Sequence, residues 1–303
     1  MGRTPRREAD VSGPFVVPEN LARSSMADPG MAAWTPYAEQ RVRDVAERWS
    51  LTLGPPYRPG GETAWVAPVR TADGADVVLK VGRWHEEAEN EADALRLWDG
   101  AGAVRLHRYE RVGDTICFLL ERCVPGTPLR ALPEPEQDVV LASVLRRTWA
   151  TPLDGTPFRP LRDLCRIWAD ETEERAAARP DVVDAGVLTA ALQVLRERPP
   201  AAREPDAALL CTDLHAGNVL AAQREPWLLV DPKPYAGERA YDVVQHLLNC
   251  PGRLVADPLG LTARMTDLCD IDVDAVRTWT FARCVTELWW WPHLLPAVRA
   301  LAP

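Results

Sequence analysis

Two neighbouring stretches decide how this chain folds and what chemistry it can support: Cys211-Thr-Asp-Leu-His-Ala-Gly-Asn-Val-Leu220 and Trp227-Leu-Leu-Val-Asp-Pro-Lys233. They hold an aspartate, an asparagine five residues later, and a second aspartate at the end of an apolar run. Phosphoryl transfer needs such a set, because one carboxylate accepts the proton of the acceptor hydroxyl, while an amide oxygen and a second carboxylate hold Mg²⁺ against the nucleotide phosphates. The pattern therefore predicts Asp213 as the catalytic base, with Asn218 and Asp231 as the magnesium ligands.

The lysines of the chain support this interpretation. Of 35 basic residues only Lys80 and Lys233 are lysines, and the rest are arginines. Lys80 ends the β-rich run Asp76-Val-Val-Leu-Lys80, which is similar to the strand whose lysine reaches the α- and β-phosphates in kinases. Lys233 follows Asp231 by two residues. A GC-rich codon bias could leave a few lysines anywhere, but such drift would not be expected to place both at kinase-type positions.

A glutamate on the helix predicted after the Lys80 strand would complete the phosphate anchor. Glu87 and Glu91 are four residues apart and would share a helix face, so either could pair with Lys80. We favour Glu91, because it leads directly into the apolar run Ala92–Trp98.

Two glycines and a histidine allow a structural as well as a functional interpretation. Gly60 and Gly61 stand between predicted strands, where they either form a simple turn or close over the nucleotide phosphates through backbone N–H groups. His215 lies two residues past the predicted base. A zinc site is not expected there, because no second His or Cys stands at ligand spacing on the same element. We expect His215 to brace the catalytic loop.

Composition is that of an ordinary globular protein, with 303 residues, 47% apolar and 26% charged. This length accommodates two subdomains. The net charge of −9 argues against a nucleic-acid partner and is compatible with a cationic ligand. The seven cysteines form no C-x-x-C pair, which predicts reduced thiols. No run of about 18 apolar residues and no signal-peptide core is found, so we expect a cytoplasmic protein that does not bind membranes.

The chain is expected to form three parts. Residues 1–33 are rich in Pro, Gly, Ser and Arg without periodicity, and this predicts a flexible N-terminal arm. Residues 34–122 are expected to form a β-rich, nucleotide-binding lobe. After the break at Glu121-Arg-Cys-Val-Pro-Gly126, residues 123–303 are expected to form a helical lobe that carries the catalytic loop and the acceptor site.

Periodicity and turn signals predict the elements of each lobe. In the β-rich lobe we expect a helix over 36–50, a hairpin that turns at 71–74 into the Lys80 strand, a helix over 86–99, and strands near 103–109 and 115–120. In the helical lobe we expect helices near 135–150, 161–178, 182–198, 240–249 and 272–291, with the two motif stretches as a short β interlude. This order predicts an α+β fold of the protein-kinase-like, bilobal kind.

These motifs also resemble a known family. From about Trp34 to Trp291 the chain is similar to the aminoglycoside phosphotransferases, and within them to the streptomycin 6-phosphotransferase/hydroxyurea kinase branch. The matching segments are Val77–Lys80, Glu91–Leu106, Leu119–Gly126, Thr212–Leu220 and Val230–Asp242. The resemblance implies ATP-dependent phosphorylation of a small hydroxylated antibiotic, with Mg²⁺ as the metal and a monomer or dimer as the working form.

The resemblance also implies residue roles. Asp213 would be the base, Asn218 and Asp231 the metal ligands, and Lys80 with Glu91 the phosphate anchor. The backbone of Glu121, Arg122 and Cys123 would form the adenine-binding hinge, and Gly60 and Gly61 the phosphate loop. Asp242 is expected to brace the catalytic loop together with His215. Glu238 and Lys233 are candidates for contact with the acceptor.

One departure concerns the residue that opens the catalytic loop. The family usually has His where this chain has Cys211, and that His acts mainly as an architectural hydrogen-bond donor. Cys211 could therefore loosen the loop without removing a chemical group.

Three functions remain open at this point. The leading one is a kinase for an aminoglycoside-type or hydroxyurea-type acceptor. The second keeps the fold but phosphorylates another metabolite alcohol or amine. The third is a catalytically dead, kinase-like binding protein, against which the intact set of Lys80, Asp213, Asn218 and Asp231 argues.

Overall fold

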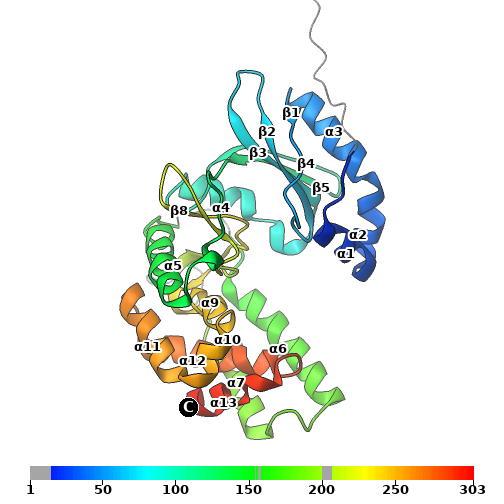
Figure 1. Ribbon diagram of the computed structural model, residues 1–303. Helices are drawn as coiled ribbons and strands as arrows, with labels where there is room; N and C mark the ends of the chain where they lie inside the picture. Colours follow the sequence, from blue (N-terminus) through cyan, green and yellow to red (C-terminus); the bar gives the residue numbers. More distant parts are fainter. Residues whose placement is uncertain (1–14, 154, 156–157, 200–206) are drawn as a thin grey trace, which may run out of the picture. The chain divides into compact units, whose positions relative to one another are not determined.

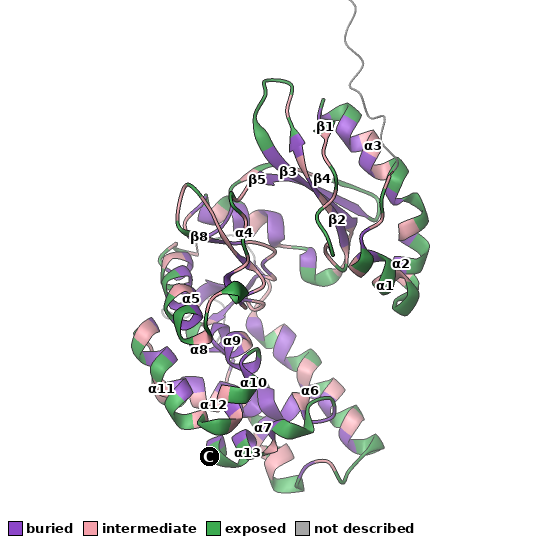
Figure 2. Ribbon diagram, viewed as in Figure 1, coloured by how far each residue is buried: buried purple, intermediate pink, exposed green. Residues whose placement is uncertain are grey.

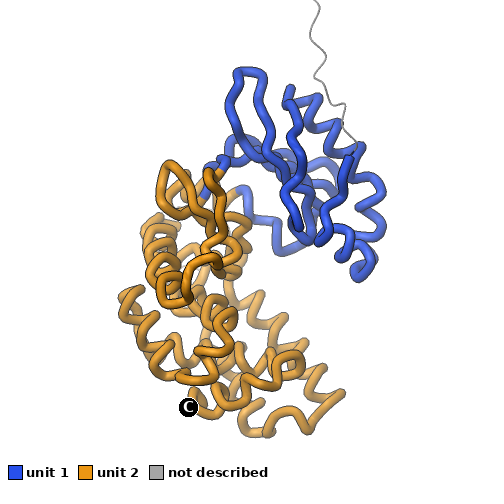
Figure 3. The backbone as a smooth tube through the Cα atoms, in the orientation of Figure 1, with its two compact units in different colours: residues 1–92, 104–122 blue, residues 93–103, 123–303 orange. Residues whose placement is uncertain are grey.

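The chain divides into two compact units, which Figure 3 colours separately. The computed structural model describes residues 15–153, 155, 158–199 and 207–303. The first unit runs to Ala92 and includes Val104–Arg122, and the second comprises Asp93–Ala103 and Cys123–Pro303. The division after Arg122 falls where the sequence places the break between lobes, whereas residues 93–103 group with the second unit rather than with the first.

The first unit contains an antiparallel sheet with the strand order β1-β2-β3-β5-β4 (Figure 1). Its strands are β1 (Thr52–Leu53), β2 (Ala64–Arg70), β3 (Asp76–Arg83), β4 (Leu106–Val112) and β5 (Thr115–Glu121). The apolar runs of β3 and β5 are buried along almost their whole length, whereas the edge strand β4 is largely exposed (Figure 2). Lys80 therefore lies on a central strand, opposite Val66 of β2 and Phe118 of β5.

Helices at the N-terminus pack on this sheet. They are α1 (Glu19–Ala27), α2 (Pro29–Trp34) and α3 (Ala38–Arg48), with a 3₁₀ turn η1 (Thr35–Tyr37) between the last two. Leu21, Trp34 and Val42 are buried in one apolar cluster with residues of β2, β3 and β5. The indole N–H of Trp34 donates to the Thr115 hydroxyl at 3.1 Å.

The prediction of a flexible arm over residues 1–33 is wrong for its second half. Residues 19–33 lie in α1 and α2, and residues 1–14 lie outside the described part. Asp28 starts α2 by accepting the N–H of Met31 at 2.6 Å, with Pro29 at the first helical position. These helices are stable because the sheet buries their apolar residues, a long-range contact that local composition does not reveal.

The helix expected over 86–99 is interrupted. A 3₁₀ turn η2 (Glu86–Ala88) comes first, and α4 (Glu91–Trp98) begins at the glutamate that was favoured as the partner of Lys80.

The second unit is mostly helical. Its helices are α5 (Glu134–Trp149), α6 (Leu161–Ala178), α7 (Ala185–Glu197), α8 (Arg239–Asp242), α9 (Val244–Leu248), α10 (Pro251–Ala256), α11 (Pro258–Cys269), α12 (Val273–Glu287) and α13 (Leu295–Leu301), with 3₁₀ turns η3 (Leu129–Ala131) and η4 (Pro292–Leu294). The largely buried α12 packs against several of them, including α7, α8, α9, α11 and α13. Asp272 caps α12 by accepting the N–H of Ala275. Helices α10, α11 and α13 were not predicted.

Two small antiparallel ribbons bring the motif stretches together. Strand β6 (Ala207–Leu210) pairs with β9 (Tyr235–Glu238), and β7 (Val219–Ala221) pairs with β8 (Trp227–Leu229). Residues 211–218 therefore connect β6 to β7, and residues 230–234 connect β8 back to β9. These two connections run next to each other, because each joins one ribbon to the other. The predicted base and metal ligands, which they carry, therefore lie side by side in the second unit. In the described ranges, no helix has the length and apolarity needed to cross a bilayer.

Candidate active site

The two residues predicted to anchor the phosphates, Lys80 and Glu91, form a buried ion pair. The ammonium of Lys80 lies 2.7 Å from each carboxylate oxygen of Glu91, whose side chain is fully buried. The alternative partner, Glu87, is exposed and lies near His85 instead. The attraction within a buried ion pair offsets little more than the free energy lost when the two charges leave water. A contribution to folding stability therefore does not by itself explain this pair.

In the second unit, two amides hold the carboxylate of Asp213. The amide nitrogen of Asn218 donates to Oδ2 at 3.2 Å and also to the Asp213 carbonyl oxygen at 3.1 Å. The amide nitrogen of Gln245, on α9, donates to Oδ1 at 3.3 Å. Both oxygens of the predicted base thus have an amide donor, which fixes the side-chain conformation of Asp213.

Asn218 and Asp231 are joined through the ends of the β7–β8 ribbon. The N–H of Val230 donates to the carbonyl oxygen of Asn218 at 2.8 Å. Asp231 follows immediately, and the ammonium of Lys233 lies 2.9 Å from its Oδ1. Since the side-chain amide nitrogen of Asn218 donates to Asp213, its side-chain oxygen, Oδ1, is the atom that could ligate a cation.

A buried carboxylate holds the start of the catalytic loop. Asp242, at the end of α8, accepts the N–H of Cys211 at 2.9 Å and that of Thr212 at 2.7 Å. The indole N–H of Trp149 donates to it at 3.0 Å. Burial raises the pKa of Asp242 to about 6, and the hydrogen bonds oppose that rise. This geometry agrees with the bracing role expected for Asp242.

The backbone is strained at two points of this region. Thr212 and Asp231 have φ values of 46° and 54°, in the left-handed region that non-glycine residues rarely adopt. The Thr212 hydroxyl donates to the carbonyl oxygen of Lys233, and the N–H of Lys233 donates to the carbonyl oxygen of Cys211 at 3.0 Å. The two connections therefore hold each other in a conformation that costs about 1–3 kcal/mol per strained residue.

His215 makes contacts within the catalytic loop. Its Nδ1 accepts the N–H of Gly217 at 3.0 Å, and its Nε2 lies 4.0 Å from Oδ1 of Asp213. Burial lowers the pKa of His215, so the ring is neutral and the accepting Nδ1 leaves its proton on Nε2. A Cβ on Gly217 would lie 2.7 Å from the ring, which explains the glycine at this position.

Cys211 contributes its backbone rather than its thiol to the site. The side chain is fully buried, and its sulfur lies 3.9 Å from the Thr148 hydroxyl. Burial raises the pKa of the Cys211 thiol well above its ordinary value, so the group is neutral and unreactive. The loop is still held through Asp242, so replacing the family's usual His leaves this attachment in place.

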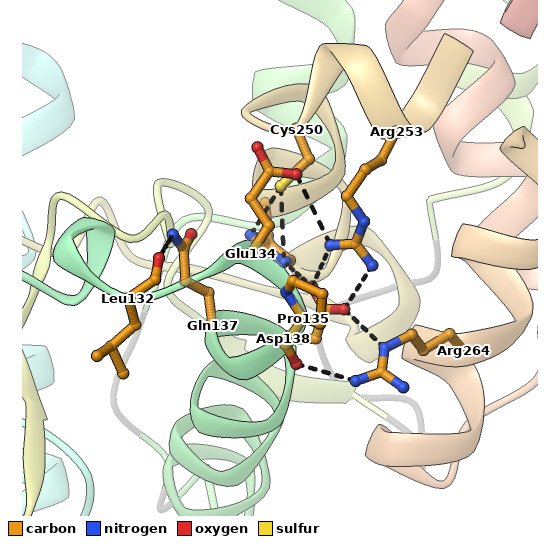
Figure 4. Close-up of polar contacts among 9 residues, drawn as sticks. Leu132, Glu134, Pro135, Gln137, Asp138, Cys250, Arg253 and Arg264 are labelled. Carbon is orange, nitrogen blue, oxygen red and sulfur yellow. Dashed lines mark hydrogen bonds and ion pairs between the residues drawn. The ribbon is translucent and has the colours of Figure 1, made fainter. Parts of the chain in front are cut away.

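A charged cluster fixes α9, the helix that carries Gln245. We call Asp138, His246, Arg253 and Arg264 the Asp138 cluster, of which Figure 4 labels Asp138 and the two arginines. The fully buried Asp138 of α5 contacts His246 at 2.8 Å, Arg253 at 2.7 and 3.0 Å, and Arg264 at 2.7 Å. Because these partners come from α9, α10 and α11, one carboxylate ties together the helices beneath the catalytic loop.

The glycines and the hinge lie in the first unit and at its end. Gly60 has a φ of 84°, and a Cβ there would lie 2.4 Å from Pro18. Asn20 of α1 donates to the Gly60 carbonyl oxygen at 2.8 Å, so this part of the β1–β2 loop is attached to the N-terminal helices.

Glu121 ends β5 and hydrogen-bonds Arg105 through its backbone N–H and its carboxylate. The hinge residues Glu121, Arg122 and Cys123 span the division between the two units.

Glu238, a candidate for acceptor contact, is engaged by neighbouring side chains. Arg198 donates to its two carboxylate oxygens at 2.7 and 3.0 Å. The indole N–H of Trp279 donates to it at 2.8 Å. A ligand that used this carboxylate would therefore compete with Arg198.

The donor set fits a magnesium ion that is completed by a nucleotide. Mg²⁺ is usually held by one or two carboxylates together with substrate phosphates and water, rather than by a cage of protein ligands. Asn218 and Asp231 supply the two oxygen donors. Within the described ranges, no group of three or more His, Cys, Asp or Glu side chains could hold a metal on its own.

A family comparison identifies this arrangement. The model of the aminoglycoside/hydroxyurea antibiotic resistance kinases matches residues 48–293. The chain belongs to this family. As a member of the antibiotic resistance kinases it is a phosphotransferase that uses ATP as its cosubstrate, and the branch expected from the sequence is confirmed.

Individual relatives agree. The chain is 35% identical to a hydroxyurea phosphotransferase of Kitasatospora aureofaciens over 254 residues, 82% of this chain and 72% of that protein. It is 31% identical to a streptomycin 6-kinase of Streptomyces glaucescens over 284 residues, 90% of each chain. An amicoumacin kinase solved with AMP-PNP, Ca²⁺ and Ami has a similar fold, with a TM-score of 0.55 at 14% identity over 88% of each chain. The α+β, protein-kinase-like class is thereby confirmed.

The sequence did not reveal every residue that surrounds Asp213. Gln245 and the Asp138 cluster were missed, because the contacts join residues 32 and 108 positions apart. A weak signal exists in the segment Tyr241-Asp-Val-Val-Gln-His246, where polar residues interrupt an otherwise apolar helix. A buried Asp, Gln or His of this kind needs a partner.

Proposed function

We propose that this antibiotic resistance kinase transfers the terminal phosphate of ATP to a hydroxyl of a small antibiotic, with Asp213 as the base. The observation that carries this proposal is the pair of amides on Asp213, because a carboxylate fixed on both oxygens is ready to accept a proton in one geometry. The relatives named above are kinases of streptomycin and hydroxyurea, and they supply the acceptor class.

The reaction assigns separate tasks to the two units' predicted site residues. The acceptor hydroxyl gives its proton to Asp213 while its oxygen bonds to the terminal phosphorus. The bond between that phosphorus and the oxygen bridging to the β-phosphate breaks, and ADP leaves. Lys80, held by Glu91, binds the α- and β-phosphates, and the backbone at Glu121–Cys123 binds adenine.

Asn218 and Asp231 would hold magnesium. When bound, that ion neutralises charge on the nucleotide phosphates. Asn218 would then have two duties, since its carbonyl oxygen ligates the ion while its amide nitrogen orients Asp213. Asp242 and His215 keep the loop in place by bonding its backbone.

The contacts of Glu238 favour a small neutral acceptor. A polycationic aminoglycoside needs carboxylates that are available to it. Glu238 is paired with Arg198, and Asp242 is buried on backbone N–H groups, so these two carboxylates are already engaged, whereas Asp267, Asp270, Asp272 and Asp274 are exposed. Hydroxyurea, which carries no charge, requires neither of them.

The reaction fits the cytoplasm, where ATP is available. The seven cysteines are all free, as expected for a reducing compartment. This localisation is part of the proposal.

A coupled ADP-release assay tests the proposal. Mg-ATP would be supplied with hydroxyurea, streptomycin or other aminoglycosides, and Asp213→Ala would serve as the control. We expect turnover with one acceptor, first of all hydroxyurea, and its loss in the variant. ATP binding without turnover on any of these acceptors would refute the antibiotic assignment.

A further inference from the structure

Lys233 is more buried than a surface lysine and contacts a predicted metal ligand. Its side chain is only 15% exposed, and its ammonium lies 2.9 Å from Oδ1 of Asp231. It is one of two lysines in a chain that otherwise uses arginine. The other, Lys80, forms the buried pair with Glu91.

The backbone fixes where the Lys233 ammonium can go. The N–H and the carbonyl oxygen of Lys233 are both bonded to the start of the catalytic loop, at Cys211 and Thr212. Asp231, two residues earlier, has the strained left-handed conformation described above. Strain of this kind persists where the surrounding structure enforces it, and it concentrates at functional sites. Removing most of an ammonium from water is also unfavourable unless an anion accompanies it.

Asp231 would pair less strongly with Lys233 during the reaction. In the proposed function, which this inference rests on, Asp231 holds a divalent cation. A cation on Asp231 withdraws negative charge from Lys233 and repels its ammonium. Such an ion would neutralise charge on the nucleotide phosphates, and a phosphate near Asp231 would then be the anion available to Lys233.

We propose that Lys233 is a binding residue for the terminal phosphate of ATP and stays with that group as it is transferred. Lysine suits this task because its compact ammonium is a point charge on a flexible stem, which can exchange one oxygen partner for another. An arginine would bind Asp231 through both N–H arms and compete with the metal ligand. In this assignment Lys80 would bind the phosphates common to ATP and ADP, and Lys233 would bind the phosphate that only ATP carries.

This division can be measured without turnover. Isothermal titration calorimetry on the full chain would compare Mg-AMP-PNP with Mg-ADP for wild type, Lys233→Met, Lys233→Arg and the matched control Lys80→Met. Losing an ionic hydrogen bond to the terminal phosphate should weaken AMP-PNP binding to Lys233→Met by about tenfold or more, and ADP binding by less than about twofold. Lys80→Met should weaken both nucleotides, and Lys233→Arg should keep part of the preference for AMP-PNP.

Lysine labelling gives a second readout if Lys233→Met does not fold. With only two lysines in the chain, an amine-reactive reagent and mass spectrometry report each one separately. AMP-PNP should protect Lys233 and ADP should not, whereas both nucleotides should protect Lys80.

Two results would overturn the inference: equal losses for both nucleotides in Lys233→Met, or equal protection of Lys233 by both. Neither result touches the proposed function if wild type phosphorylates an acceptor. Conversely, a selective loss of AMP-PNP binding in a chain that phosphorylates none of the acceptors would leave Lys233 assigned and refute the acceptor class. A wild-type chain that binds neither nucleotide contradicts both proposals.

Discussion

Both carboxylate oxygens of Asp242 lie 2.9 Å from the backbone nitrogen of Cys211, although the catalytic loop, the β7–β8 ribbon and strand β9 separate the two residues in the chain. This contact attaches the first residue of the loop to the helical core through a buried negative charge. Asp213 comes two residues later, so the position of the base depends on a carboxylate that takes no part in the chemistry. The predictions below begin from this dependence.

Replacing Asp242 by Asn should separate stability from activity. The pKa of Asp242 is raised to about 6 by burial, above its ordinary 3.8, so the folded state holds the proton more tightly than the unfolded state. The protonated Asp242 therefore adds to the free energy of unfolding below about pH 4. This contribution is lost as the pH rises through about 6, a change on the order of 3 kcal/mol. The free energy of unfolding of Asp242→Asn, measured in urea, should rise relative to wild type over this pH range.

Activity of the same variant should fall. An Asn side chain presents N–H groups to the N–H groups of Cys211 and Thr212, which loosens the loop, and a misplaced base lowers kcat by about tenfold or more. If the difference in free energy of unfolding between Asp242→Asn and wild type stays the same from about pH 4 to pH 7, burial does not raise the pKa of Asp242.

Gln245→Leu should lower kcat with little effect on KM. Leucine fills a similar volume but cannot donate to Asp213, and one lost hydrogen bond to a charged group corresponds to about a tenfold fall in kcat. Gln193→Leu is the matched control, because Gln193 lies on the exposed side of α7, where its amide nitrogen donates to Glu197.

Gln245→Glu adds a test of the contact itself. An ionised Glu would repel Asp213, whereas a protonated Glu can donate to it, so the activity of this variant relative to wild type should be greatest at the acidic end of the pH range. If Gln245→Leu and Gln193→Leu have the same kcat, Gln245 does not position the base.

Asp138→Asn should strongly destabilise the second unit. Burial alone would raise the pKa of Asp138, but bonds from His246, Arg253 and Arg264 outweigh it, and the pKa is held well below its ordinary value. Its stabilisation is therefore present above the ordinary value of 3.8 and lost as the pH falls below it. Breaking such a buried network typically costs about 3–5 kcal/mol at neutral pH.

Urea unfolding at neutral pH measures this cost. The exposed Asp170, which lies 3.5 Å from Arg196, offers a surface control, and Asp170→Asn should change stability by less than about 1 kcal/mol. Equal effects of the two substitutions would show that the Asp138 cluster does not anchor the helices.

Alkylation should select one cysteine in the native chain. Cys123 is the only cysteine that is not buried, and all seven lie in the described residues. Burial raises the pKa to about 12 for the following thiols: Cys117, Cys165, Cys250, Cys269 and Cys284. Iodoacetamide at neutral pH, followed by mass spectrometry, should therefore label Cys123 first. AMP-PNP should slow that labelling if the backbone there binds adenine, whereas comparable labelling of a buried cysteine would contradict this account.

The sequence predicted the parts of this protein that are local in the chain. The strand that carries Lys80, a helix after it and a short β interlude around Asp213 follow from apolar runs and turn residues a few positions apart, although the helix begins only at Glu91 and the pairing of the strands into two ribbons was not predicted. The fold class and family could be inferred because these short motifs occur in a fixed order. The roles assigned to the individual site residues remain predictions.

Features that depend on distant contacts could not be read from the sequence. The composition of helices α1 and α2 is polar enough to suggest an arm. Their apolar residues are buried only by a sheet whose strands lie further along the sequence. Gln245 reaches Asp213 because α9 packs next to the loop, and Asp138 contacts α9 through His246. No local pattern around Gln245 or Asp138 specifies these partners.

The most direct test of the central claim is to identify the product. The chain would be incubated with Mg-ATP carrying a labelled terminal phosphate and with each acceptor, and the acceptor would be analysed by mass spectrometry beside an Asp213→Asn control. We expect one labelled phosphate on a single acceptor, and a rate lower by about 10²–10⁴ in the variant, because Asn cannot take the proton. Label found only in inorganic phosphate, or equal product from the variant, would contradict the assignment of Asp213 as the base of an antibiotic kinase.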